Sequence, residues 1–213
     1  MIDVLRAFTV SAYALARGAT ACRLVREVEE ARELAARIPG ALVSAEVGGL
    51  PVAGIPISNS PTQINMTDLE GRVLVQRSSA GTQAMAAADH AERRYAGSLV
   101  VAGATAQDIR RNGAETVTLV ASRGDHEEDV ACARLLDALL RGEPAPQGFL
   151  DALCGSERYH SLVRGENPGF PPSDCELALL VDRFDFAMPV GEDDLGIKVV
   201  AERMQQAAVE PAR

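Results

Sequence analysis

Residues 1–9 read MIDVLRAFT and place an acid, Asp3, and a base, Arg6, where a short apolar run meets a helix. In an α/β protein such a junction lies at the carboxyl edge of the sheet, where ligands bind. The Asp3 carboxylate suits a metal, the Arg6 guanidinium suits an anion, and the first N–H groups of the helix suit a phosphate. We therefore expect a ligand site at the start of the first helix.

Outward from this stretch, the sequence alternates between strand and helix patterns. Strands are predicted at 21–25, 41–43, 72–77, 98–101 and 116–121, and helices at 9–17, 27–37, 82–88, 106–112 and 127–141. This alternation indicates an α/β fold with a mostly parallel or mixed sheet and helices on both faces.

The segments between and after these elements are less regular. Residues 44–61 are rich in Gly, Pro, Ser and Asn and predict a long loop. Helices are predicted at 174–184 and 195–206, with a turn at 188–191. We expect a single domain over residues 1–206 and a frayed tail at 207–213.

Composition limits the kind of partner. The formal net charge is −9, and no basic stripe is available to displace the counterions of a nucleic acid. No apolar run has membrane-spanning length, and no signal peptide is apparent. The four cysteines contain no CxxC pair, so we expect reduced thiols in a cytoplasmic protein. The three histidines lack the spacing of a zinc motif.

Several polar groups could serve chemistry, and each has a simpler interpretation. The turn Ser78-Ser79-Ala80-Gly81-Thr82 follows a strand and could cradle an anion, although Ser and Thr also cap helices in general. Ser58-Asn59-Ser60-Pro61 predicts a capped helix start that presents polar groups. Alone, Glu46 is typical of a solvated loop acid. Asp129 and Cys132 share one helix face, and a lone cysteine is usually a small buried hydrophobe.

Motifs of other enzyme classes are absent from the sequence. There is no C-x5-R pattern of a cysteine phosphatase, no G-x4-G-K-[ST] pattern of an NTPase, and no second acid of a DxD aspartyl phosphatase after Asp3. A nicotinamide-dependent oxidoreductase is disfavoured because no G-x-G-x-x-G follows a strand.

In order and spacing, these segments resemble the 2-phosphosulfolactate phosphatase (ComB-like) family. The resemblance spans most of the chain and is carried by Ile2–Ala7 with Thr9, Glu46, Ser58–Pro61, Ser78-Ser79 with Gly81-Thr82, Val101–Gly103, Glu128-Asp129 with Cys132, and Asp174, Leu179, Asp182 and Pro189. It implies a single-domain α/β hydrolase that removes phosphate from 2-phospho-3-sulfolactate on the route to coenzyme M, with magnesium as cofactor.

The resemblance also implies roles for residues at matching positions. Asp3, Glu46 and Asp129 would bind Mg²⁺, which prefers carboxylate oxygens. Arg6 would bind the anionic groups of the substrate. Asp3, Arg6 and Cys132 are the expected catalytic residues, and the expected substrate-binding residues are Thr9, Asn59, Ser60, Ser78, Ser79, Gly81 and Thr82.

Departures from the family pattern leave alternatives open. Val47 stands where the family has an arginine, and Ala80 and Gln83 replace an asparagine and an arginine. A related, less charged phospho-acid is therefore an alternative substrate, and a non-catalytic anion-binding protein is an alternative function. The nucleophile could be water, Asp3 or Cys132.

The segment before Asp3 is too short for a full strand. We therefore expect either a start upstream of Met1 or a missing strand whose open edges a homodimer would cover.

Overall fold

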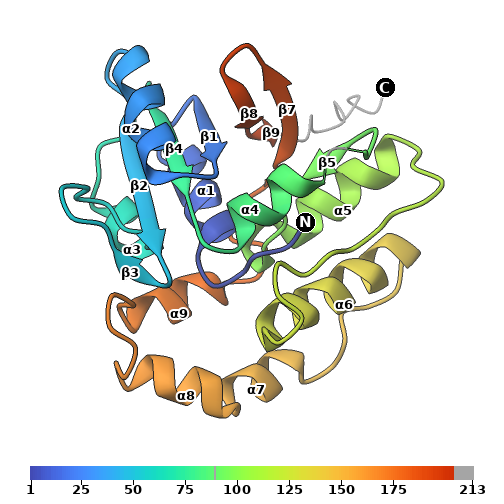
Figure 1. Ribbon diagram of the computed structural model, residues 1–213. Coiled ribbons are helices and arrows are strands. Elements are labelled where there is room, and N and C mark those ends of the chain that lie inside the picture. Colours follow the sequence, from blue (N-terminus) through green and yellow to red (C-terminus); the bar gives the residue numbers. More distant parts are fainter. Residues whose placement is uncertain (89, 204–213) are drawn as a thin grey trace, which may run out of the picture.

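The computed structural model of the protein describes residues 1–88 and 90–203 (Figure 1). Its strands are β1 Ala21–Val25, β2 Leu42–Val47, β3 Leu50–Pro51, β4 Val73–Arg77, β5 Arg94–Tyr95, β6 Phe186–Ala187, β7 Pro189–Asp193, β8 Gly196–Val199 and β9 Glu202–Arg203. Its helices are α1 Ala7–Ala16, α2 Val28–Arg37, α3 Pro61–Asn65, α4 Gly81–Ala87, the 3-10 helix η1 Leu99–Val101, α5 Ala102–Arg111, α6 Glu127–Arg141, α7 Phe149–Cys154, α8 Glu157–Val163 and α9 Ser173–Ala178.

Seven of these strands form one mixed sheet in the order β3-β2-β4-β1-β8-β7-β5. Strands β2, β4 and β1 are parallel neighbours, whereas β3, β8, β7 and β5 each pair antiparallel. A second, two-stranded sheet joins β6 to β9. The prediction of an α/β fold with a mixed sheet is confirmed.

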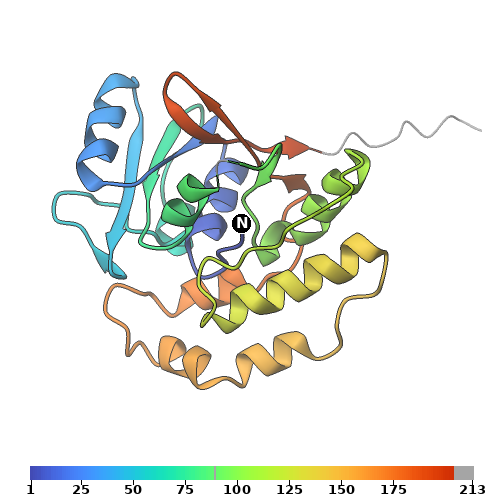
Figure 2. The same ribbon diagram turned by 45° about the vertical axis from the view of Figure 1, so that its right-hand side comes forward.

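Helices cover both faces of the parallel strands because successive strand side chains point to opposite faces. On one face, Leu24 and Leu74 pack with the buried residues of α1. On the other face, Val25 and Val75 pack against Ala31 and Leu34 of α2. Helices α7 and α8 lie at the bottom of Figure 1, and the turned view in Figure 2 shows them below α6. Helix α9 lies between α8 and α3 and packs against both.

Helix α1 is the centre of the fold, because nine of its ten residues are buried. A helix that is buried all round needs partners for any polar group it carries. Gln76 of β4 provides them: its amide accepts a hydrogen bond from Ser11 Oγ at 2.7 Å and donates to the Ala7 carbonyl at 2.7 Å and to Asn59 Oδ1 at 3.1 Å. The start of α1, β4 and the loop before α3 are thereby fixed to one another.

Ile2 enters the fold as a single bridging residue between two other segments. It forms parallel bridges with Gly97 and Ala121, with its N–H donating to the Val120 carbonyl at 2.8 Å and the Asp3 N–H donating to the Gly97 carbonyl at 3.1 Å. Ile2 thus pairs with both neighbouring segments as a strand residue would, and Asp3 follows it directly on the carboxyl side.

Several predicted elements are confirmed and others are wrong. The strand at 21–25 and the helix at 127–141 have the predicted bounds. The predicted strand at 98–101 is the 3-10 helix η1 leading into α5, and in the predicted strand at 116–121 only Ala121 forms a bridge. The 98–101 run is buried on all sides, and a short apolar run of that kind does not distinguish strand from helix.

The remaining differences lie in the loops and near the carboxyl end. Strand β2 extends to Val47, so the predicted loop at 44–61 starts later and contains β3. The predicted turn at 188–191 belongs to β7, and β8 and β9 replace the described part of the predicted helix at 195–206. The predicted helix at 174–184 is shortened to α9. Residues 204–206 and the predicted tail at 207–213 lie outside the described residues.

None of the helices in the described part of the chain is both long enough and apolar enough to cross a membrane.

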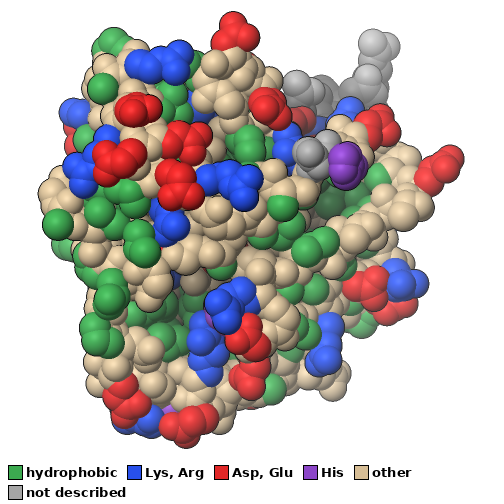
Figure 3. Space-filling model, in the orientation of Figure 1, with side chains coloured by type: hydrophobic (Ala, Val, Ile, Leu, Met, Phe, Trp, Pro, Cys, Tyr) green, Lys and Arg blue, Asp and Glu red, His purple; other side chains and the backbone are tan. Residues whose placement is uncertain are grey.

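On the face shown in Figure 3, Lys and Arg side chains are interspersed with Asp and Glu rather than gathered in one stripe.

Candidate active site

Asp3 is buried just before α1, and its carboxylate bonds to the first N–H group of that helix. Its Oδ1 accepts a hydrogen bond from the Ala7 N–H at 3.1 Å, and the residue is 4 % exposed. The Gly81 N–H at the start of α4 also bonds to this carboxylate. Burial first, and then the charge of Asp129, raise the pKa of Asp3 well above its ordinary range. Asp3 is therefore an acid held at a helix start beside a second acid.

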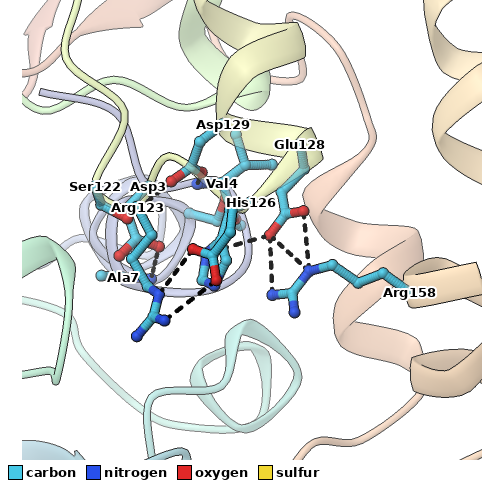
Figure 4. Close-up of polar contacts among 11 residues, drawn as sticks. Asp3, Val4, Ala7, Ser122, Arg123, His126, Glu128, Asp129 and Arg158 are labelled. Atoms are coloured by element: carbon cyan, nitrogen blue, oxygen red, sulfur yellow. Dashed lines mark hydrogen bonds and ion pairs between the residues drawn. The ribbon is translucent and has the colours of Figure 1, made fainter. Parts of the chain in front are cut away.

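Asp129 is the second carboxylate of this pair and lies in the first turn of α6 (Figure 4). It accepts hydrogen bonds from the Val4 N–H at 2.8 Å and from Ser122 Oγ at 2.8 Å. Burial raises the pKa of Asp129 to about 6, while the hydrogen bond from Val4 opposes that rise. Two buried acids so close together strongly favour a cation or a shared proton between them.

This raised pKa makes stability depend on pH in a defined direction. From about pH 4 to about pH 6, native Asp129 holds a proton that the unfolded chain has lost, so the free energy of unfolding falls as pH rises. The fall attributable to this group is at most about 3 kcal/mol. Urea unfolding in EDTA at several pH values measures it, and Asp129→Asn is expected to lack that part of the slope. The same slope in both proteins would contradict the assignment.

Gly81 allows α4 to approach Asp3 closely. A Cβ atom at this position would lie 2.6 Å from Asp3 Oδ2 and 2.8 Å from Ala7 Cβ. We expect Gly81→Ala to push Asp3 aside and to destabilise the fold by about 1–3 kcal/mol, as overpacking does. The matched control is Gly191→Ala, because nothing lies within 4 Å of a Cβ built there. Thermal unfolding compares the two variants, and equal stability would contradict this close contact.

Arg6 is 7 % exposed and lies beneath two loops. Its guanidinium donates to the carbonyls of Gly49 at 3.3 Å and Gly169 at 3.1 Å, and it stacks over Phe170 at 4.8 Å. Its φ of 133° lies in a region that non-glycine residues rarely adopt, and such strain is found mostly at functional sites.

The charges around Arg6 come from residues that are distant in sequence. Burial lowers the pKa of Arg6, whereas Glu46, Asp174 and Asp3 raise it. No carboxylate of the described residues forms an ion pair with Arg6 within 4.0 Å. Arg6 is thus a buried cation, held by carbonyl groups and by longer-range attraction, that retains capacity for an anion.

Glu46 ties the β2–β3 turn to the turn after β4. Its carboxylate accepts hydrogen bonds from the Ser79 N–H at 2.5 Å, the Gly49 N–H at 2.6 Å and Ser79 Oγ at 3.1 Å. Arg77 also donates to the Glu46 carbonyl. In this arrangement Glu46 positions both turns through its side chain.

The turn at residues 78–82 differs from the open anion cradle that the sequence predicts. The Ser78 N–H donates to Thr82 Oγ1 at 2.9 Å and the Thr82 N–H donates to Ser78 Oγ at 3.0 Å. The Ser79 and Gly81 N–H groups bond to Glu46 and Asp3. Four of the N–H groups in this turn therefore already have protein partners and hold two acids in place.

Other predicted site residues form internal contacts. Thr9 is buried in α1 and bonds to the Val4 carbonyl and Ser98 Oγ, both at 2.6 Å. Asn59 accepts from Gln76. Ser60 caps α3 and donates to Asp174 Oδ1 at 2.7 Å. These three side chains orient the segments around the site through these contacts.

Cys132 has the surroundings of a structural thiol. It is fully buried within an apolar cluster that includes Ile2 and Leu136. Burial, and then the charge of Asp129, raise the pKa of the Cys132 thiol far above its ordinary value. Because the thiolate is the nucleophilic form, this environment counts against the predicted catalytic role of Cys132.

Three residues near the site were given no role by sequence reasoning. Asp174 is fully buried, accepts from Ser60 and Thr62, and has an Oδ2 atom without a partner. Phe170 and Arg158 reach the site from the region after α6. Asp174 belongs to the family resemblance, but no local pattern marks Phe170 or Arg158, because only tertiary packing brings them here.

The cavity of about 800 Å³ between α4, α5 and residues 114–120 is separate from these acids. Met1 and Ile2 line it together with Tyr95 and Thr105, whereas Asp3, Arg6 and Asp129 do not. We place the site at the carboxylate cluster of Asp3, Asp129 and Glu128 because these buried acids lie near the buried cation Arg6.

The fold and the site together define an α/β protein whose buried acids and arginine meet at the carboxyl ends of strand segments. The model of the family described as 2-phosphosulpholactate phosphatase matches residues 1–161. The chain belongs to this family, whose description is that of hydrolases acting on phosphoric monoesters.

Individual relatives agree with this assignment. A Bacillus subtilis (strain 168) protein named "Probable 2-phosphosulfolactate phosphatase" is 27 % identical over 197 residues, which cover 91 % of this chain and 86 % of the relative. Proteins of the same name from Caldicellulosiruptor saccharolyticus and Carboxydothermus hydrogenoformans are 31 % and 36 % identical, over 72 % and 66 % of this chain and 66 % and 59 % of their own lengths.

Proposed function

We propose that this protein is a Mg²⁺-dependent phosphatase that converts 2-phospho-3-sulfolactate, or a related small anionic phospho-acid, to the hydroxy acid and phosphate. The observation that carries the proposal is the pair of buried acids Asp3, three residues before the cation Arg6, and Asp129, in the first turn of α6. Family membership supplies the reaction class.

The acids fit a hard divalent cation. Asp3 and Asp129 offer carboxylate oxygens, and burial is the main cause of their raised pKa values. A bound cation would stabilise the charged form of both acids. No group of three His, Cys, Asp or Glu side chains among residues 1–88 and 90–203 is arranged to surround a metal. Mg²⁺ nevertheless often takes one or two carboxylates and completes its shell with water and substrate phosphate.

In this proposal Asp3 and Asp129 would hold the ion. Glu46 would hold the turn at residues 78–82 in place through its hydrogen bonds to Ser79. A bound Mg²⁺ would supply Lewis-acid stabilisation of the phosphoryl oxygens. Arg6 binds an anionic group of the substrate from the side of α1. Its contact with Phe170 and with the Gly49 and Gly169 carbonyls fixes the plane of the guanidinium before substrate arrives.

The test is phosphate release from 2-phosphosulfolactate, phospholactate and phosphoglycerates, each with Mg²⁺ or EDTA. Release that requires Mg²⁺ and is fastest with the sulfonated acid would support the proposal in full. Preference for another ester would keep the chemistry and change the substrate.

A non-catalytic anion-binding protein is the second candidate function. The observation that favours it is the occupied turn at residues 78–82, where Glu46 and Asp3 take N–H groups that a phosphate would use. Binding of a phosphoester in calorimetry without release of phosphate, with Mg²⁺ present, would establish this function in place of the enzyme.

A further inference from the structure

Helix α8 brings a second arginine to the carboxylate cluster. Arg158, in the first turn of α8, donates from Nε and Nη2 to the Glu128 carboxylate at 3.2 Å each (Figure 4). Glu128 is 4 % exposed and also lies 3.6 Å from Nδ1 of His126. The acid is thus held between two side chains, and Arg158 is anchored by a buried partner.

Arg158 and Arg6 approach the same cluster from two different elements. Glu128, the hydrogen-bond partner of Arg158, lies near enough to Asp3 for its charge to raise the pKa of Asp3 further. The charge of Arg158 in turn lowers the pKa of Arg6. Glu128 offsets part of the repulsion between these two guanidinium groups, and an anionic ligand beside them would offset more of it.

Arg158 keeps donors that the described protein does not use. Its side chain is 36 % exposed, whereas that of Glu128 is 5 % exposed. Its hydrogen bonds to described residues leave from Nε and Nη2 and all go to Glu128, so Nη1 donates to none of them. A guanidinium held on one edge and open on the other is suited to bind a carboxylate or sulfonate.

We propose that Arg158 binds a second anionic group of the substrate, the carboxylate or sulfonate that is not hydrolysed, while the phosphate lies at Asp3, Asp129 and Arg6. This inference rests on the proposed function and makes Arg158 the residue that gives the site its preference for substrates with a second anionic group. Glu128 is the positioning residue that fixes the Arg158 side chain.

The experiment compares Arg158→Gln with wild type on three esters. These are 2-phosphosulfolactate, 2-phospholactate, which lacks the sulfonate, and phenyl phosphate, which lacks both further anions. The matched control is Arg164→Gln, at the end of the same helix, where Arg164 pairs with exposed Glu157 and Glu166. The double variant Glu128→Gln/Arg158→Gln removes the unpaired buried acid that Arg158→Gln would leave.

We expect Arg158→Gln and the double variant to raise KM for 2-phosphosulfolactate roughly 10- to 100-fold, with kcat nearly unchanged, as for loss of a charged hydrogen bond. Phenyl phosphate kinetics should stay within a few-fold, and Arg164→Gln should alter neither substrate. A KM effect shared by 2-phospholactate assigns Arg158 to the carboxylate, and one confined to the sulfonated ester assigns it to the sulfonate.

Equal losses on all three esters, or no loss on any, in both Arg158 variants would overturn the inference. If wild type releases phosphate from none of them, the proposed function fails, and calorimetric binding of the same three esters decides the role of Arg158. A selective loss of affinity for the esters with two or more anions then still supports the inference, and an unselective result refutes it.

Discussion

Asp3→Asn is expected to reduce kcat for phosphate release by roughly 10³-fold or more while leaving the protein at least as stable as wild type. Asparagine keeps a side-chain oxygen that accepts hydrogen bonds, so the hydrogen bond from the Ala7 N–H persists. The substitution also removes one charge from a buried acidic pair, which relieves repulsion with Asp129. Phosphate release and urea unfolding measure the two effects.

The matched control for this variant is Asp108→Asn. Asp108 is also fully buried, but it bonds to Tyr95, Arg111 and Asn112 and has no contact with the acidic pair. We expect this control to lose about 1–3 kcal/mol of stability and to keep its activity. Wild-type turnover by Asp3→Asn would remove Asp3 from the mechanism.

Arg6→Lys is expected to lower kcat/KM for the phospho-acid roughly 10²- to 10³-fold. A lysine ammonium cannot reproduce the planar contact with Phe170 while donating to the Gly49 and Gly169 carbonyls. Both side chains carry a positive charge, so a large effect would show that orientation matters beyond charge.

Arg17→Lys, at the other end of α1, is the control for Arg6→Lys. Arg17 is exposed and donates from Nε to the Thr67 carbonyl at 3.0 Å. Steady-state kinetics of both variants, with thermal unfolding to confirm folding, makes the comparison. Similar kcat/KM values for Arg6→Lys and wild type would argue that Arg6 is a structural residue.

Sequence rules correctly predicted the elements whose own residues carry clear signals of helix or strand. Helix α6 has three acids in its first turn and Arg141 in its last, and it ends at Gly142 in the left-handed conformation. Strand β1 is a short apolar run between turns. For α6 capping and charge indicate the helix, and for β1 the hydrophobic run indicates the strand. The predicted bounds of both are confirmed.

The β7–β8 hairpin shows where local rules were insufficient. Val190, Ile197 and Val199 are β-branched, and Gly196 has a φ of 86° beside the turn. These are hairpin signals that a helical interpretation of residues 195–206 overlooks. Tertiary contact also contributes, because Arg23 of β1 binds Asp193 at 2.5 Å.

The candidate site could be predicted only where its residues carry local sequence signals. Asp3 and Arg6 stand together in sequence, and Asp129 shares the first turn of a well-predicted helix. Arg158 is 30 residues from Glu128 and lies on a helix of seven residues, too short for a clear periodic signal. The bonds that occupy the turn at residues 78–82 likewise depend on Glu46 from another strand.

The measurement that tests the central claim most directly is a crystal structure with Mn²⁺ in place of Mg²⁺ and with phosphate bound, using the anomalous signal of manganese to locate the metal. The account predicts Mn²⁺ bonded to the carboxylates of Asp3 and Asp129, with the phosphate on the ion and within hydrogen-bond distance of Arg6. A metal and phosphate bound elsewhere, or an Asp3–Asp129 pair that stays free of metal at saturating Mn²⁺, would contradict it.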